Sequence, residues 1–248
     1  MPHRVLCLLL LASPLWPASV KRHFSHFAQS IGNRNRLHIN SLITDPGTLE
    51  LESAFIYSEI GNYAAPVLLK YTPSRGSTEL SVGFDSWRGS SDVALAANTL
   101  LYDGSHWNVV LGPSLVLVRQ NGDGLRPGAT FITRYDNGLA SLGLSATWSK
   151  ATRPTDNNPA DQTAFGIGGG LRLGKEGWRS HWTLNSNALN ERASSTRAMN
   201  STFEGLEWEL NSRLSINLVA QQLDWRGPNR DNQALVGLTV NFGHIRLH

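Results

Sequence analysis

Cysteine is almost absent from this chain of 248 residues, since Cys7 is the only one. We expect the segment that contains Cys7 to be removed on export, so no disulfide is available to stabilise the mature domain. A domain of this size then depends on its backbone hydrogen bonds and on side-chain packing. A closed β-sheet meets that requirement well, because closure leaves no free edge strand.

Long hydrophobic runs are missing as well. The mean hydropathy is −0.24, and the longest apolar run, Val5–Leu11, is too short to cross a bilayer as a helix. These features exclude a helical-bundle membrane protein. Arg4 before this run and Pro14 and Pro17 after it are typical of a secretory signal peptide, which we place at residues 1–19.

The chain has little excess charge of either sign, with a formal net charge of +3. It contains no basic stripe of the kind that binds nucleic acid, so no nucleic-acid partner is expected. We assign residues 20–46 to a periplasmic N-terminal segment that is solvated or loosely folded. His23 and His26 lie in it without a cysteine or a paired carboxylate beside them, so neither a metal site nor any other cofactor is expected.

Period-two alternation of apolar and polar residues is abundant from Gly47 onward. The alternating segments are separated by clusters of Gly, Asn, Asp and Pro, which is the pattern of β-strands and turns. About twelve strands are predicted, at Thr48–Ser58, Ala65–Thr72, Thr78–Trp87, Val93–Tyr102, Trp107–Val118, Ala129–Tyr135, Leu139–Trp148, Ala164–Leu173, Trp178–Ala188, Phe203–Asn211, Leu214–Leu223 and Ala234–Phe242.

The connections alternate between short and long. Tight turns are predicted at Pro73–Gly76, Asp103–Gly104, Asp136–Gly138, Gly174–Gly177 and Asn211–Ser212. Longer polar loops are predicted at Asn121–Pro127, Thr152–Gln162, Asn190–Thr202 and Trp225–Asn232. Short turns at one rim and long loops at the other are typical of outer-membrane barrels. The predicted fold is therefore all-β: a single antiparallel transmembrane β-barrel over residues 47–243, with short periplasmic turns, longer extracellular loops and a C-terminal tail at 244–248.

The predicted number of strands indicates whether the polar or the apolar face of the sheet points into the barrel. Barrels of about eight strands can fill their interior with side chains, whereas about twelve strands enclose a wider lumen. We therefore expect the polar face to point inward and the apolar face to meet lipid. The aromatic residues predicted near strand ends fit an interface girdle. The candidate lumen-lining residues are Glu50, Glu52, Lys70, Glu79, Asp85, Arg134, Arg172, Arg179, His181, Glu207 and Glu209.

Two stretches carry a resemblance to a known family. The opening segment Thr44–Glu52 (TDPGTLELE) and the closing segment Ala234–Gly243 resemble the first and last strands of bacterial outer-membrane barrels described as transporters of the meta-pathway of phenol degradation. Between them the likeness is one of pattern only. The resemblance implies passage of small solutes, hydrophobic or aromatic ones among them, and it implies no catalytic residues. The chain departs from the family after Phe242, where such barrels commonly end.

Three functions follow as hypotheses. The first is a small-solute channel in the outer membrane of a Gram-negative-type cell, which has membrane lipid, the solute and the barrel assembly machinery as partners. The second is a non-conducting structural or adhesive barrel. The third is a lipid-acting enzyme, which we do not favour because no His-x-Ser pair occurs in the chain. The luminal charges are compatible with either an open path or a lumen closed by ion pairs.

Overall fold

The computed structural model describes residues 43–59, 63–74, 76–87, 90–118, 124–154, 160–173, 181–193, 198–224 and 230–244. The signal peptide predicted at residues 1–19, most of the predicted N-terminal segment and all but the first residue of the predicted tail lie outside the described residues. Within the described part of the chain, no helix is long and apolar enough to cross a membrane.

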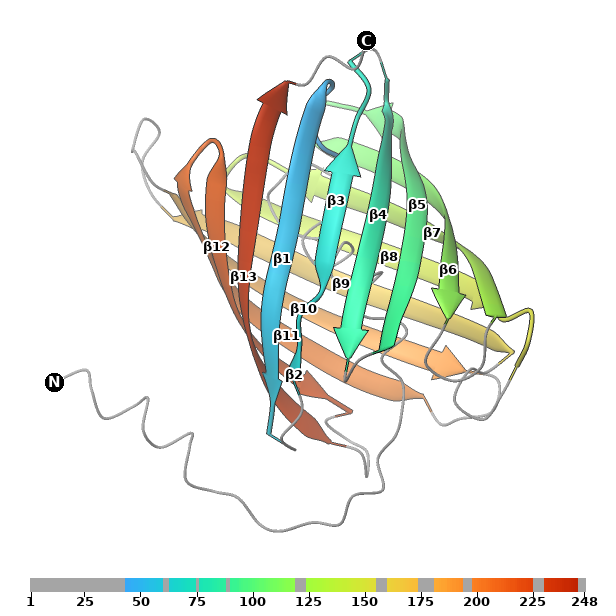
Figure 1. Ribbon diagram of the computed structural model, residues 1–248. Coiled ribbons are helices and arrows are strands. Elements are labelled where there is room, and N and C mark those ends of the chain that lie inside the picture. The colour runs from blue at the N-terminus through green and yellow to red at the C-terminus, as the bar shows by residue number, and fades with distance from the viewer. Residues whose placement is uncertain are drawn as a thin grey trace, which may run out of the picture.

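The described residues form one antiparallel sheet that closes on itself (Figure 1). Except for β2 and β3, which do not pair with each other, strands that are adjacent in the sequence pair. The last strand also pairs with the first, as the register of Phe55 opposite Val236 shows. The strands are β1 (Thr48–Ser58), β2 (Tyr63–Ala64), β3 (Val67–Tyr71), β4 (Thr78–Trp87), β5 (Ser90–Asp103), β6 (Trp107–Val118), β7 (Gly124–Asp136), β8 (Ala140–Lys150), β9 (Asp161–Leu173), β10 (His181–Ala193), β11 (Met199–Asn211), β12 (Leu214–Leu223) and β13 (Asp231–His244).

Strands β2 and β3 occupy one place in the wall, because both pair with β1 on one side and with β4 on the other. The barrel therefore has twelve strand positions, which confirms the predicted fold class. The break between the two pieces falls at Ala65 and Pro66. Proline has no N–H to donate to a neighbouring strand, so the single strand predicted at Ala65–Thr72 is interrupted there.

Side chains of the turn residues form the tight turns. Asp136 Oδ1 accepts from the backbone N–H of Gly138 at 2.7 Å, and Asn211 Oδ1 accepts from that of Arg213 at 2.8 Å. Such local bonds are the reason that Asp and Asn are common in turns. These turns, together with Thr48 and His244, lie at one end of the barrel, here named the short-turn rim. The opposite end is the long-loop rim.

Several strands extend further toward the long-loop rim than the sequence pattern predicts. The predicted loop Asn190–Thr202 is wrong at both ends, because β10 continues to Ala193 and β11 begins at Met199. In this extension the side chain of Asn190 donates to that of Asn200 at 2.7 Å. Backbone pairing continues here through polar residues, which the alternation of apolar and polar residues cannot detect.

The start of β7 shows the same effect. Gly124–Pro127 was predicted to be loop, yet it pairs with β6, as in the register of Pro127 opposite Leu115. The pairing of β7 with β8 begins only at Gly128, opposite Ser149. Proline is tolerated in β7 because this stretch has a strand neighbour on one side only.

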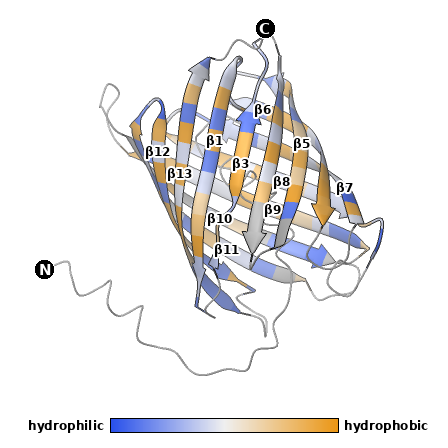
Figure 2. Ribbon diagram, viewed as in Figure 1, coloured by the Kyte–Doolittle hydropathy of each residue, from blue (hydrophilic) through white to orange (hydrophobic). Residues whose placement is uncertain are grey.

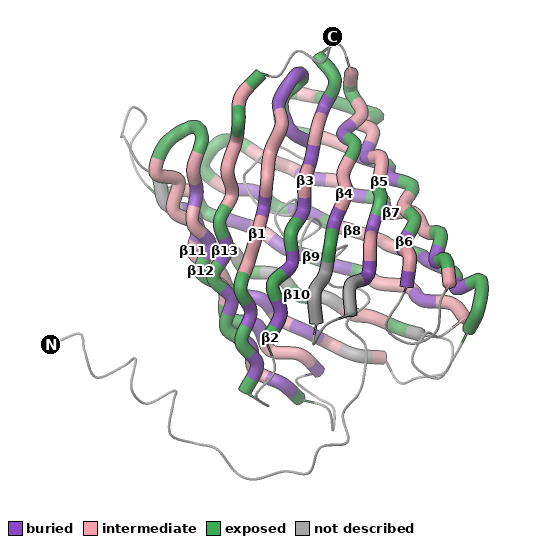
Figure 3. Tube along the Cα trace, viewed as in Figure 1, coloured by how far each residue is buried: buried purple, intermediate pink, exposed green. Residues whose placement is uncertain are grey.

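Hydropathy and burial vary from residue to residue along the strands of the wall (Figures 2 and 3). In β1, Phe55 and Tyr57 are 54% and 51% exposed, whereas Glu52 and Ser58 on the opposite face are 4% and 1% exposed. The same contrast recurs around the barrel: large apolar side chains point outward and most of the buried side chains are polar. A soluble barrel would show the reverse arrangement, so this wall fits contact with lipid.

Aromatic residues stand on the outer face near the strand ends. Trp107 begins β6, is about half exposed and lies 5.3 Å from Tyr135, measured between ring centroids. Phe242 near the end of β13 is equally exposed, and Trp148 has a similar exposure near the end of β8. Amphipathic rings at these heights are typical of membrane–water interfaces.

Candidate functional site

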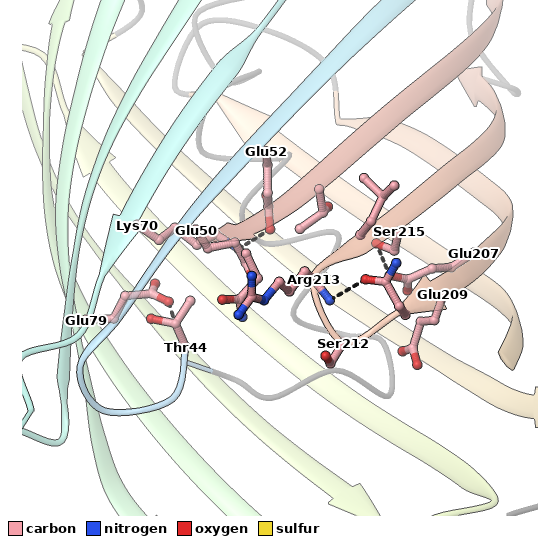
Figure 4. Close-up of a pocket in the computed structure, with 14 residues that line it drawn as sticks. Thr44, Glu50, Glu52, Lys70, Glu79, Glu207, Glu209, Ser212, Arg213 and Ser215 are labelled. Atoms are coloured by element: carbon pink, nitrogen blue, oxygen red, sulfur yellow. Dashed lines mark hydrogen bonds and ion pairs between the residues drawn. The ribbon is translucent and has the colours of Figure 1, made fainter. Parts of the chain in front are cut away.

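Charged side chains gather inside the barrel at the short-turn rim and enclose a cavity of about 220 Å³ (Figure 4). Strands from opposite ends of the sequence meet here, because β1 pairs with both β3 and β13 and thereby joins them to β11 and β12. The cavity is lined by Thr44, Glu50, Glu52, Lys70, Glu79, Glu207, Glu209, Asn211, Ser212, Arg213, Leu214, Ser215, Thr239 and Asn241.

Lys70 holds two glutamates of the neighbouring strand. Its Nζ lies 3.2 Å from Glu50 Oε1 and also donates to Glu52 Oε1. The register sets this contact, since Lys70 on β3 stands directly opposite Glu50 on β1. The side chains of Lys70 and Glu52 are only 6% and 5% exposed. The ammonium therefore compensates two carboxylates that would be costly to bury alone.

Glu79 connects the β4 wall to the chain segment before β1. Its Oε2 accepts from the backbone N–H of Thr44 at 2.9 Å, and its Oε1 accepts from the amide of Asn98 at 3.4 Å. Glu79 is 1% exposed, so these polar contacts replace water around the buried carboxylate.

Glu207 and Glu209 approach the cavity from β11. Ser215 on β12 donates its hydroxyl to Glu207 Oε1 at 3.0 Å. Arg213 belongs to the turn between these two strands, and Figure 4 shows it extending from that turn into the cavity. The lining therefore has five glutamates against two basic side chains, Lys70 and Arg213, and its formal charge is negative.

Six of the residues predicted from the sequence meet at this cavity, whereas the described residues Arg134 and Arg172 do not line it. Arg134 on β7 is buried and lies 3.3 Å from Asp136, and Arg172 is half-buried on β9. Asp85 and His181 belong to β4 and β10, but their side chains are not described, and Arg179 lies outside the described residues.

The charged or polar residues of the interior that the sequence does not single out include Arg126, Arg213 and Thr44. Arg126 is fully buried and donates to Ser149 Oγ at 3.2 Å, but it fell in a stretch predicted to be loop. Arg213 falls between the turn predicted at Asn211–Ser212 and the strand predicted from Leu214, and Thr44 belongs to the segment predicted to lie outside the barrel. One feature of the sequence points to Arg213. It lies in the two-residue turn that follows the strand of Glu209, and a turn that short keeps the arginine close to that strand.

Among the residues that the structure describes, no cluster of three or more His, Cys, Asp or Glu side chains has the arrangement of a metal site. His106 lies at the short-turn rim, where its Nδ1 is 3.1 Å from the carbonyl oxygen of Asp136 and its ring contacts Tyr135.

Comparisons with known proteins identify the fold. No family model matches the chain, and no curated protein matches its sequence, so the resemblance to the phenol meta-pathway family stays a prediction. Among solved structures, the KdgM porin aligns with a TM-score of 0.61 at 11% identity, over 80% of this chain and 99% of that one. It has also been solved in complex with disordered oligogalacturonate.

The NanC porin aligns similarly, with a TM-score of 0.59 at 11% identity, over 77% of this chain and 98% of that one. At such low identity the likeness concerns the fold alone. The chain therefore has the twelve-stranded barrel fold of outer-membrane porins.

Proposed function

We propose that this protein is an outer-membrane channel for small solutes, and that the lining of its short-turn rim favours cations. One observation carries the proposal: a closed barrel with an apolar outer face encloses a cavity lined by five glutamates and two basic residues. Rings of carboxylates attract cations and repel anions at short range. In this proposal the chain is exported, inserted by the barrel assembly machinery, and acts without a cofactor and without catalysis.

The nature of the solute follows from the same lining. The family resemblance implies hydrophobic or aromatic solutes, but a neutral aromatic ring has few favourable contacts with carboxylates at this rim. A small polar cation can exchange part of its hydration for Glu207, Glu209 and their neighbours. We therefore propose small polar cations as the preferred solutes.

A non-conducting structural barrel is the second candidate. The contacts of Lys70 with Glu50 and Glu52 favour it, because ion pairs that cross between strands occupy lumen space. The two candidates differ in whether ions pass through the protein.

The test is single-channel recording of the purified protein in a planar bilayer under a salt gradient. We expect discrete conductance steps with a preference for cations. In the variant Glu207→Gln/Glu209→Gln the ratio of cation to anion permeability should fall by roughly two- to tenfold, since two lining charges are removed. The measured quantity is the reversal potential.

Glu204→Gln provides the matched control. Glu204 lies on the same strand as Glu207, but it is exposed and accepts from Ser186 at 2.9 Å, away from the cavity lining. Its replacement should leave the reversal potential unchanged. A correctly folded, inserted protein that passes no current would refute the channel and support the structural barrel.

A further inference from the structure

The chain turns into the barrel immediately before β1. The backbone N–H of Thr48 donates to Asp45 O at 3.0 Å, and that of Gly47 donates to Thr72 O at 2.7 Å. Gly47 has φ +83°, a left-handed conformation that glycine adopts without strain. This turn reverses the direction of the chain at the short-turn rim. Residues 43–47 are here named the inner strap.

Besides the bond from Gly47, two hydrogen bonds of Thr44 hold the inner strap to the inner wall. Thr44 donates its backbone N–H to Glu79 Oε2 at 2.9 Å, and its hydroxyl lies 2.8 Å from that of Thr72. Both threonines are buried, at 6% and 0% exposure. Thr44 also lines the charged cavity, so the inner strap forms part of the lumen surface.

Ile43 contacts the strands that follow β4 along the inner wall. It is 9% exposed and packs in one cluster with Val110 on β6, Ile132 on β7 and Leu100 on β5. Val110 and Ile132 are fully buried, and the residues next to them that face outward, Leu111 and Phe131, are 41% and 43% exposed. The cluster with Ile43 is therefore on the inner face of the wall.

The order of the strands in the wall shows which part of the barrel the inner strap covers. From β1 the wall runs through β3, β4, β5 and β6 to β7, so β7 stands five positions away in a barrel of twelve. The inner strap starts at β1, is bonded to β4 at Thr44 and reaches β5–β7 at Ile43. Because it contacts the chain at the end of β3, then β4 and then β5–β7, the inner strap lies inside the barrel along one side of the wall and narrows the opening at the short-turn rim.

We infer that the inner strap is the constriction of the channel, with Ile43 and Thr44 setting the size of solute that passes the short-turn rim. This inference rests on the proposed function. An apolar anchor at Ile43 and polar bonds at Thr44 hold the segment in place without a covalent link, so removing either should widen the opening. The charged lining would still select the sign of the solute, while the inner strap limits its size.

The experiment replaces the two anchors separately in the full-length protein. Ile43→Ser removes the apolar contact, and Thr44→Pro removes both the N–H donated to Glu79 and the hydroxyl bonded to Thr72. We expect either variant to raise single-channel conductance by about twofold or more, and to admit larger sugars in liposome swelling, because conductance follows pore cross-section.

Ile56→Ser is the matched control. Ile56 is also a buried isoleucine of the inner face, 1% exposed, but it packs with Ala64 and Leu235, far along β1 from the inner strap. Its replacement should leave both the conductance and the size limit unchanged. Far-UV circular dichroism verifies that each variant keeps its β-sheet content.

The possible outcomes distinguish a failure of the constriction proposal from a failure of the channel proposal. If the wild-type protein conducts and both Ile43→Ser and Thr44→Pro match it in conductance and size limit, the inner strap is not the constriction and the channel stands. If the wild type is silent and Ile43→Ser conducts, the inner strap closes the lumen and the wild type is not an open channel. If the wild type and both variants are silent, both proposals fail.

Discussion

Replacing Lys70 by methionine is expected to lower the free energy of unfolding by about 3 kcal/mol, because the change leaves one buried and one partly buried carboxylate without their shared cation. Glu50 and Glu52 both contact the Lys70 ammonium, and the Lys70 and Glu52 side chains are almost fully buried. Methionine keeps most of the side-chain volume, so the loss of stability comes from the missing charge rather than from a cavity. Urea titration of the protein in lipid vesicles, followed by tryptophan fluorescence, measures it.

Two further variants make this prediction specific. Adding Glu52→Gln to Lys70→Met removes one of the unpaired charges and should recover about 1 kcal/mol or more, so the two changes should not be additive. Lys150→Met removes an exposed lysine at the end of β8 and should change stability by less than about 0.5 kcal/mol. Equal effects of Lys70→Met and Lys150→Met would contradict the buried ion pair.

The sequence predicts a structural feature of this protein well where that feature depends on residues within one strand, and poorly where it depends on a neighbouring strand. The alternation of side chains within a strand is local, and β1, β4, β6 and β12 have the predicted bounds at Thr48–Ser58, Thr78–Trp87, Trp107–Val118 and Leu214–Leu223. The polar extensions of β10 and β11 are not local, because each is stabilised by the backbone of the strand beside it. Patterns within one strand contain no information about that neighbour.

The sequence gives candidates for charged residues that face the lumen, but it does not predict which of them meet at the cavity. Polar residues at alternate positions identified Glu52, Glu79 and Glu207 as inward-facing candidates, and these three lie at the cavity. The contact of Lys70 with Glu50 depends on the register between β1 and β3, which no single strand encodes. Nor could alternation find Ile43, whose place in the interior depends on three strands that follow it in the sequence.

The outer face provides the second large expected effect. Leu144 lies in the middle of β8, is 50% exposed, and stands beside Ile167 of β9, which is equally exposed. Leu144→Arg would place a guanidinium against hydrocarbon near mid-membrane, which costs about 2–4 kcal/mol in barrels of this kind. The same unfolding titration in vesicles should show this loss.

The adjacent residue distinguishes a membrane effect from general damage to the strand. Ser145 follows Leu144 in β8 but faces the lumen, where it pairs with Ile132 on one side and with Gly166 on the other. Ser145 is partly exposed, so arginine at this position can reach water in the lumen and Ser145→Arg should cost less than about 1 kcal/mol. If Ser145→Arg were as destabilising as Leu144→Arg, the assignment of inner and outer faces would be wrong. A large difference in the expected direction would show that the apolar face of this barrel meets lipid, on which the channel proposal depends.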